Sequence, residues 1–259
     1  METIPVKASA KEALTLPFEH FGEFLRLSFW PMMIIWISQF VGGALAVATE
    51  DALFYALWWL AYGIIVVPFS ISWTRLVVLD VGSNTGRTWH TFGRKEFKYL
   101  SVACTITLLL FGPSALFFYI AYSMEWAAVP LILACVVLIA ELAVGIRFTF
   151  ILPAIAVDSY VGLKTAWKQT RSVVLRIMAV IFLSGLPINC GTSILHRIET
   201  TSADQPPLLV VLGTVGVLLL FLSAAVTTGA IAVSFRSRMD PALFVARQAV
   251  DVVGLTPSE

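Results

Sequence analysis

The chain of 259 residues is 59% hydrophobic and only 13% charged, with a formal net charge of +1. Its mean hydropathy of +0.89 is typical of integral membrane proteins rather than of soluble domains. The sequence has no dense basic cluster and no recognised nucleic-acid-binding motif, so it gives no support to a nucleic-acid partner.

Residues 1–26 are predicted to form a cytoplasmic amphipathic segment ahead of the membrane domain. Apolar side chains recur there at spacings of four, three and four residues, at Leu14, Phe18, Phe21 and Leu25. Such spacing places them on one face of a helix, and Pro17 is expected to break that helix or to start it. We expect this helix to lie in the plane of the lipid headgroups.

Six long apolar runs are the basis of the predicted fold. They cover residues 27–48, 52–74, 99–123, 127–151, 173–195 and 207–235. Each is close to the roughly 20 helical residues that cross a hydrocarbon core. We therefore predict an all-α integral membrane protein in which residues 27–235 form six transmembrane helices, arranged as three hairpins. Residues 236–259 are predicted to be a cytoplasmic, amphipathic C-terminal tail.

The distribution of positive charge predicts the orientation of these helices. If the N-terminus is cytoplasmic, every Lys and Arg except Arg197 lies on the cytoplasmic side or in the inner ends of the helices. Short loops that carry Lys and Arg are retained on the cytoplasmic face. Both termini are therefore expected in the cytoplasm, where the basic face should attract anionic lipid headgroups.

Two cytoplasmic segments repeat a pattern in which an acid is followed by a tryptophan. Asp80 precedes Trp89 at the same spacing as Asp158 precedes Trp167, and a new apolar run follows each pair. Aromatic and basic residues gather where helices meet headgroups. The repeat predicts that Trp89 and Trp167 anchor equivalent interfacial helices, and a third unit begins at Asp240.

Glu141 lies near the middle of the fourth apolar run, where an ionisable side chain is expensive and often functional. Arg147 follows on another face of the same helix, so Arg75 or Arg236 is the better-placed partner; Gln39 is a further polar candidate. One hypothesis is that Glu141 carries a coupled proton or ion. The favoured alternative is a buried ion pair, or a protonated carboxyl hydrogen-bonded within the bundle. Arg75 and Arg147 are also explained by side chains that extend to the inner headgroups.

The residue types that usually act in catalysis or metal binding form no recognisable motif. The three cysteines lie in separate apolar runs, without the spacing of a zinc site or a disulfide framework, at Cys104, Cys135 and Cys190. The three histidines lie in different segments, at His20, His90 and His196. No hydrolase, metalloprotease or nucleotide-binding motif is present. We therefore predict no catalytic residue, no metal and no cofactor.

The residues from Arg147 to Asp158, with the helical segment 163–170 after them, contain an Arg, a Pro-Ala-hydrophobic run, an acid and an Ala-Trp pair. This stretch resembles a pattern in poorly characterised six-span bacterial inner-membrane proteins. It is also similar to the membrane domain of some glycerophosphoryl diester phosphodiesterases. The resemblance implies a bacterial inner-membrane location and marks Arg147, Pro153, Asp158 and Trp167 as family positions with structural roles. It implies no phosphodiesterase activity, because the soluble catalytic domain is lacking.

Three hypotheses of function follow, in decreasing order of support. The first is a non-catalytic inner-membrane protein that organises a partner protein or lipids through its basic and aromatic cytoplasmic rim. The second is a small transporter or channel that uses Glu141. The third is a membrane enzyme that acts on lipid, which the lack of a catalytic motif disfavours.

Overall fold

A computed structural model describes residues 4–49, 52–79, 93–123, 128–159, 162–201 and 206–238. Within these residues the chain is helical, with short turns and no strand. The helices are α1 (Val6–Glu19), α2 (Phe21–Thr49), α3 (Ala52–Leu79), α4 (Arg94–Ser123), α5 (Ala128–Phe148), α6 (Ile151–Ala156), α7 (Leu163–Thr170), α8 (Val174–Thr201) and α9 (Pro206–Arg236).

Five helical segments in the described part of the chain are long and apolar enough to cross a membrane. They are Ala61–Leu79, Arg94–Ala121, Leu131–Ala156, Val174–Leu195 and Val210–Arg236. The all-helical fold expected from the sequence is therefore confirmed, and the five apolar helices fit a multi-pass membrane protein. The first predicted span, 27–48, falls within α2, which is continuous over 29 residues. The surroundings of the α2 side chains beyond residue 38 lie outside the described part, and so does most of the C-terminal tail, 239–259.

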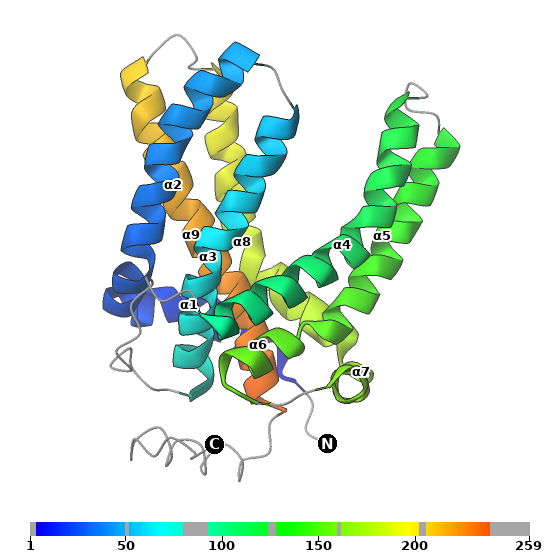
Figure 1. Cartoon of the computed structure of the whole chain (residues 1–259). Helices are drawn as coiled ribbons and strands as arrows, with labels where there is room; N and C mark the ends of the chain where they lie inside the picture. Colours follow the sequence, from blue (N-terminus) through cyan, green and yellow to red (C-terminus); the bar gives the residue numbers. More distant parts are fainter. Residues whose placement is uncertain are drawn as a thin grey trace.

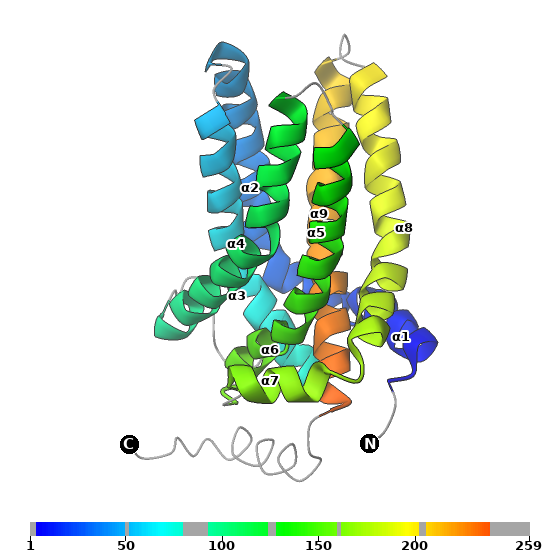
Figure 2. The same cartoon turned by 90° about the vertical axis from the view of Figure 1, so that its right-hand side faces the viewer.

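The helices form antiparallel pairs, and one pair stands apart from the rest. In Figure 1, α2, α3, α8 and α9 lie together, whereas α4 and α5 lean away from them as a separate hairpin. We call the first group the bundle and the α4–α5 hairpin the arm. Figure 2 shows α1, α6 and α7 at one common end of the molecule. We call this end the basic rim, because it contains Arg75, Lys95, Arg147, Lys164 and Arg236.

An aromatic cluster forms the centre of the bundle. Trp73 on α3 is fully buried, and its ring stacks on Phe69 and meets Phe24 edge to face. The Trp73 indole Nε1–H donates a hydrogen bond of 2.9 Å to the Ala225 carbonyl of α9. Ala225 is itself fully buried, and a small residue at this place lets the α9 backbone approach the indole. Packing and a satisfied indole N–H therefore join α3 to α9.

The N-terminal helix α1 packs against α8 and α9 through its small residues. Pro17 lies inside α1, which continues to Glu19, so the expected break at this proline is wrong. The buried face contains Ala10, Ala13 and Leu16, whereas Phe18 is 61% exposed. Alanines allow a close approach to α9, so the larger aromatic side chains of the predicted apolar face are left outside.

The arm meets the bundle mainly near the basic rim. Tyr99, in the first turns of α4, is buried against Val67 and Ile71 of α3 and Ile155 of α6. Farther along the arm the large apolar side chains are exposed; Leu108 is 72% and Ile139 is 64% exposed. The arm is therefore attached at one end, and most of its surface is free of contact with the rest of the chain that the structure describes.

Candidate functional site: charged residues at the basic rim

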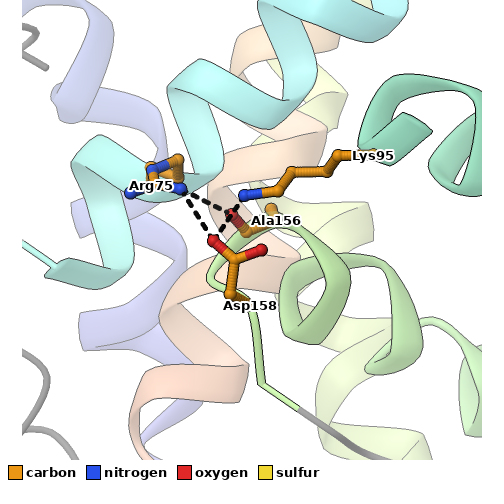
Figure 3. Close-up of polar contacts among 4 residues, drawn as sticks. All are labelled: Arg75, Lys95, Ala156 and Asp158. Carbon is orange, nitrogen blue, oxygen red and sulfur yellow. Dashed lines mark hydrogen bonds and ion pairs between the residues drawn. The ribbon is translucent and has the colours of Figure 1, made fainter. Parts of the chain in front are cut away.

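Three helical elements bring charged side chains together at the basic rim (Figure 3). Asp158 follows α6, and its Oδ2 accepts hydrogen bonds from Arg75 on α3, at 3.1 Å, and from Lys95 on α4. The same Arg75 nitrogen lies 3.4 Å from the Ala156 carbonyl oxygen. Asp158 was predicted as an interfacial anchor and Arg75 as a partner of Glu141. The structure instead joins Arg75 to Asp158.

The backbone at the end of α6 determines where the Asp158 carboxylate points. Asp158 has a φ of 55°, in the left-handed region that glycine normally occupies. The Ser159 N–H donates to the Ala154 carbonyl at 2.7 Å, and the Asp158 N–H donates to Ile155 at 3.3 Å. This is the Schellman pattern of helix termination. Aspartate tolerates the left-handed conformation better than most residues, and here it also supplies a carboxylate to two cations.

A pocket of about 670 Å³ lies beside this cluster, where α4 begins. Its lining consists of Gly93, Arg94, Lys95, Glu96, Lys98, Ile155, Asp158 and Ser159. The Glu96 carboxylate is buried and accepts a hydrogen bond of 2.8 Å from the Gly93 N–H, which caps the helix. Both carboxylates in the pocket therefore already have partners, one a backbone N–H and the other two cations.

Two further cations of the pocket are exposed. Arg94 and Lys98 stand one helical turn apart on α4, so their side chains share a face of that helix. Neither has an ion pair within the part of the chain that the structure describes. Phe97, between them, is 66% exposed. The pocket therefore presents available positive charge next to an exposed aromatic ring.

Arg147 and Trp167 form a second contact at the basic rim. The Arg147 guanidinium carbon lies 4.2 Å from the centre of the Trp167 ring, a cation–π geometry. The Thr170 hydroxyl donates to the Ala166 carbonyl at 2.7 Å and lies 3.3 Å from the Arg147 carbonyl oxygen. Trp167 therefore lies on a short helix, as predicted for its segment. In the predicted repeat, Trp89 is the equivalent of Trp167 and Asp80 is the equivalent of Asp158, and both lie outside the described residues.

Glu141 is separate from the charges of the basic rim. Its Oε1 accepts a hydrogen bond of 3.0 Å from the Ser114 N–H on α4. This donor follows Pro113, which has no N–H of its own and weakens the helical ladder there. The other oxygen, Oε2, is buried and has no hydrogen-bond partner among the described residues. Of the two expected arrangements, the geometry fits the hydrogen-bonded carboxyl.

The arginine partners predicted for Glu141 bind elsewhere. Arg236 forms an ion pair with Glu12 of α1 and donates a hydrogen bond of 3.0 Å to the Val77 carbonyl. Sequence reasoning missed Glu12 as a partner, because nothing in the local spacing brings the first helix to the last one. The sequence does indicate Arg94, Lys95 and Lys98 as basic residues mixed with aromatic ones before an apolar run, but it gives no sign that Lys95 meets Asp158.

The described residues contain no group of three or more His, Cys, Asp or Glu side chains that could hold a metal ion. No family model, curated protein or solved structure matches the chain. The similarity to the phosphodiesterase membrane domain remains a prediction from Arg147, Pro153, Asp158 and Trp167. The structure gives Arg147, Asp158 and Trp167 definite contacts at the basic rim, and it buries Pro153 in α6.

Proposed function

We propose that this protein is a non-catalytic, six-span protein of a bacterial inner membrane that organises anionic lipids through its basic rim. In this proposal α2 also crosses the membrane and so adds a span to the five described above. The basic rim and both termini face the cytoplasm. The alternative is that the basic rim binds a partner protein instead of lipids. The observation that carries the proposal is the pocket at the start of α4, with its exposed Arg94 and Lys98.

The distribution of charge supports the proposed orientation. Arg75, Arg147 and Arg236 lie at the ends of their helices near the basic rim, and Arg197 lies towards the opposite end of α8 (Figure 1). Cations of this kind are retained on the cytoplasmic side. Reporters fused at Asp51, Glu125 and Asp204 should give external signals. A cytoplasmic signal at any of these positions contradicts the six-span topology.

Charge and exposed apolar surface together favour lipid as the bound component. The exposed cations Arg94 and Lys98 are at the pocket, and the same helix, α4, continues as an apolar segment with the exposed Leu108. Each basic residue near an anionic surface contributes about 1 kcal/mol of attraction. A soluble anion would use only the charges, whereas a lipid uses the charges and the apolar surface together.

Lipid retention in mild detergent tests the proposal. We expect the purified protein to retain phosphatidylglycerol in preference to phosphatidylcholine, as measured by mass spectrometry of the intact complex. The Arg94→Gln/Lys98→Gln variant should lose most of this preference. The comparison variant is Lys164→Gln/Lys168→Gln, which removes two exposed cations of the basic rim, also one turn apart, from α7 outside the pocket and should therefore lose less of the preference. Equal retention of both lipids by the unmodified protein, or a stoichiometric protein partner in place of lipid, contradicts the proposal.

A small transporter is the second candidate, and the unpartnered Glu141 Oε2 is the observation that favours it. A buried carboxyl in a membrane span can take up and release a proton on a transport path. Proton flux into protein-containing vesicles separates the two functions. A flux that Glu141→Gln abolishes while the fold is retained supports transport. Our proposal predicts no such flux.

A further inference from the structure

We propose that the pocket at the start of α4 binds the phosphomonoester headgroup of a membrane lipid, in preference to the phosphodiester headgroups of ordinary anionic phospholipids. The inference rests on the proposed function and names the lipid class. A phosphomonoester carries a charge of about −1.5 to −2 near neutral pH and offers three terminal oxygens. A diester carries a single charge and offers two free oxygens.

The charge balance of the pocket fits a dianion. Arg94, Lys95 and Lys98 line it together with two carboxylates, Glu96 and Asp158. Arg75 adds a fourth cation through its ion pair with Asp158, so the cluster has two positive charges in excess. Nearby cations favour the more highly charged form of a bound phosphate. A monoester neutralises the excess, whereas a diester leaves one positive charge without a counterion.

The binding groups are side chains rather than the end of α4. The Gly93 N–H already donates to Glu96, so this backbone group is occupied. Arg94 and Lys98 are exposed and one turn apart, so they can approach a phosphate from two sides. Arginine binds two phosphate oxygens at once through its planar fork, and lysine adds a point charge. Lys95 is half-buried and keeps Asp158 turned towards the cations.

The neighbouring apolar surface indicates a lipid rather than a soluble phosphate. Phe97 is exposed beside the pocket, and Leu108 and Leu116 are exposed farther along α4. An acyl chain can lie along these side chains while the headgroup occupies the pocket. A soluble phosphomonoester would leave this surface unused.

The experiment compares two lipids at equal surface charge. The full-length protein is placed in nanodiscs of phosphatidylcholine that contain either phosphatidate or about twice the mole fraction of phosphatidylglycerol. Lipids retained after mild extraction are counted by mass spectrometry. We expect phosphatidate to be bound roughly tenfold more tightly than phosphatidylglycerol. This difference in affinity corresponds to about one additional charge-assisted hydrogen bond. Arg94→Gln/Lys98→Gln should reduce this ratio to near one. Lys164→Gln/Lys168→Gln removes charge of the basic rim outside the pocket, so it should weaken the binding of both lipids alike and leave their ratio unchanged.

The outcomes separate this inference from the proposed function. Equal binding of the two lipids, both preferred to phosphatidylcholine, overturns the inference and leaves the proposed function in place. No preference for either anionic lipid overturns both. Glycerol 3-phosphate in solution serves as the third arm. If it displaces phosphatidate at concentrations comparable to the lipid itself, the site recognises a soluble phosphate, and the assignment to a lipid is wrong.

Discussion

The bundle and the arm are built from equally apolar helices, yet they are held in place differently. In the bundle, Trp73 and Ala225 are fully buried and joined by a hydrogen bond, and α1 covers α8 and α9 at the basic rim. In the arm, Leu108 and Ile139 are exposed, and α4 and α5 pack mainly on each other. Hydropathy alone does not distinguish the two regions, because both are suited to lipid.

The difference indicates which interactions determine how an apolar helix packs. Lipid tails solvate exposed leucines as well as other helices do, so apolar character gives little preference for helix–helix contact. The bundle is specified by close packing around small residues and by satisfied polar groups. In the arm, a hydrogen bond from the Ser114 N–H to Glu141 joins α4 to α5, and Lys95 provides a charged attachment to Asp158. Its polar residues therefore have a large effect relative to its packing.

The largest effect is expected from truncation of Trp73. Trp73→Ala removes a fully buried indole and leaves the Ala225 carbonyl without its 2.9 Å hydrogen bond. We expect a loss of about 2–4 kcal/mol in the free energy of unfolding in mild detergent, mostly from the cavity and the lost contacts. The control is Leu108→Ala in the arm, which should cost less than about 0.5 kcal/mol because that side chain is exposed. Similar losses for both variants would contradict the distinction between bundle and arm.

Substitutions of Glu141 test whether its hydrogen bond to Ser114 stabilises the arm. Glu141→Gln keeps an oxygen that can accept from the Ser114 N–H and should change the free energy of unfolding by less than about 1 kcal/mol. Glu141→Ala removes this buried hydrogen bond and leaves a cavity, and we expect a loss of about 1–3 kcal/mol. Thermal unfolding of both variants in one detergent measures the difference. A loss for Gln as large as the loss for Ala would instead indicate an ionised Glu141 with a cationic partner, because both substitutions leave that cation unpaired.

The helices could be predicted from the sequence because their signal is local. A run of apolar residues predicts a long apolar helix whatever it packs against, and five of the six predicted runs each fall within one described helix, to within a residue. The run 127–151 is less regular in the structure, where α5 ends at Phe148 and the short α6 begins at Ile151. Local spacing also led to the wrong interpretation of Pro17, because packing against α9 keeps α1 helical through this proline.

The partners of the charged residues could not be predicted, since they come from distant parts of the chain. Arg236 binds Glu12 across nearly the whole sequence, and Arg75 binds Asp158 from another helix pair. The position of Asp158 depends on a left-handed backbone that no pattern of residue types indicates. An Asp in place of the usual glycine is only noticed once the φ angle is known.

The smallest changes in stability are expected at Asp158, where the arm joins the bundle. Three substitutions there separate the contribution of its ion pairs from that of its left-handed backbone. Asp158→Asn keeps a side chain that tolerates the left-handed backbone but removes the charge that binds Arg75 and Lys95. Because the Asp158 side chain is 58% exposed, solvent screens these ion pairs. We expect this variant to lose about 0.5–1 kcal/mol of stability.

Asp158→Ala also loses the ion pairs, and in addition it places an ordinary side chain at a φ of 55°. Asp158→Gly loses the same pairs but removes the steric conflict, which is worth about 1 kcal/mol. The order of stability should therefore be Gly above Asn and Asn above Ala, with about 1 kcal/mol between Gly and Ala. Thermal unfolding of the three variants in parallel measures this order. If Gly and Ala are equally stable, the backbone at Asp158 is not left-handed, and the Schellman termination of α6 is wrong. If Asn matches the unmodified protein, Arg75 and Lys95 do not hold the arm through Asp158, and its attachment rests on the apolar contacts of Tyr99 with α3 and α6.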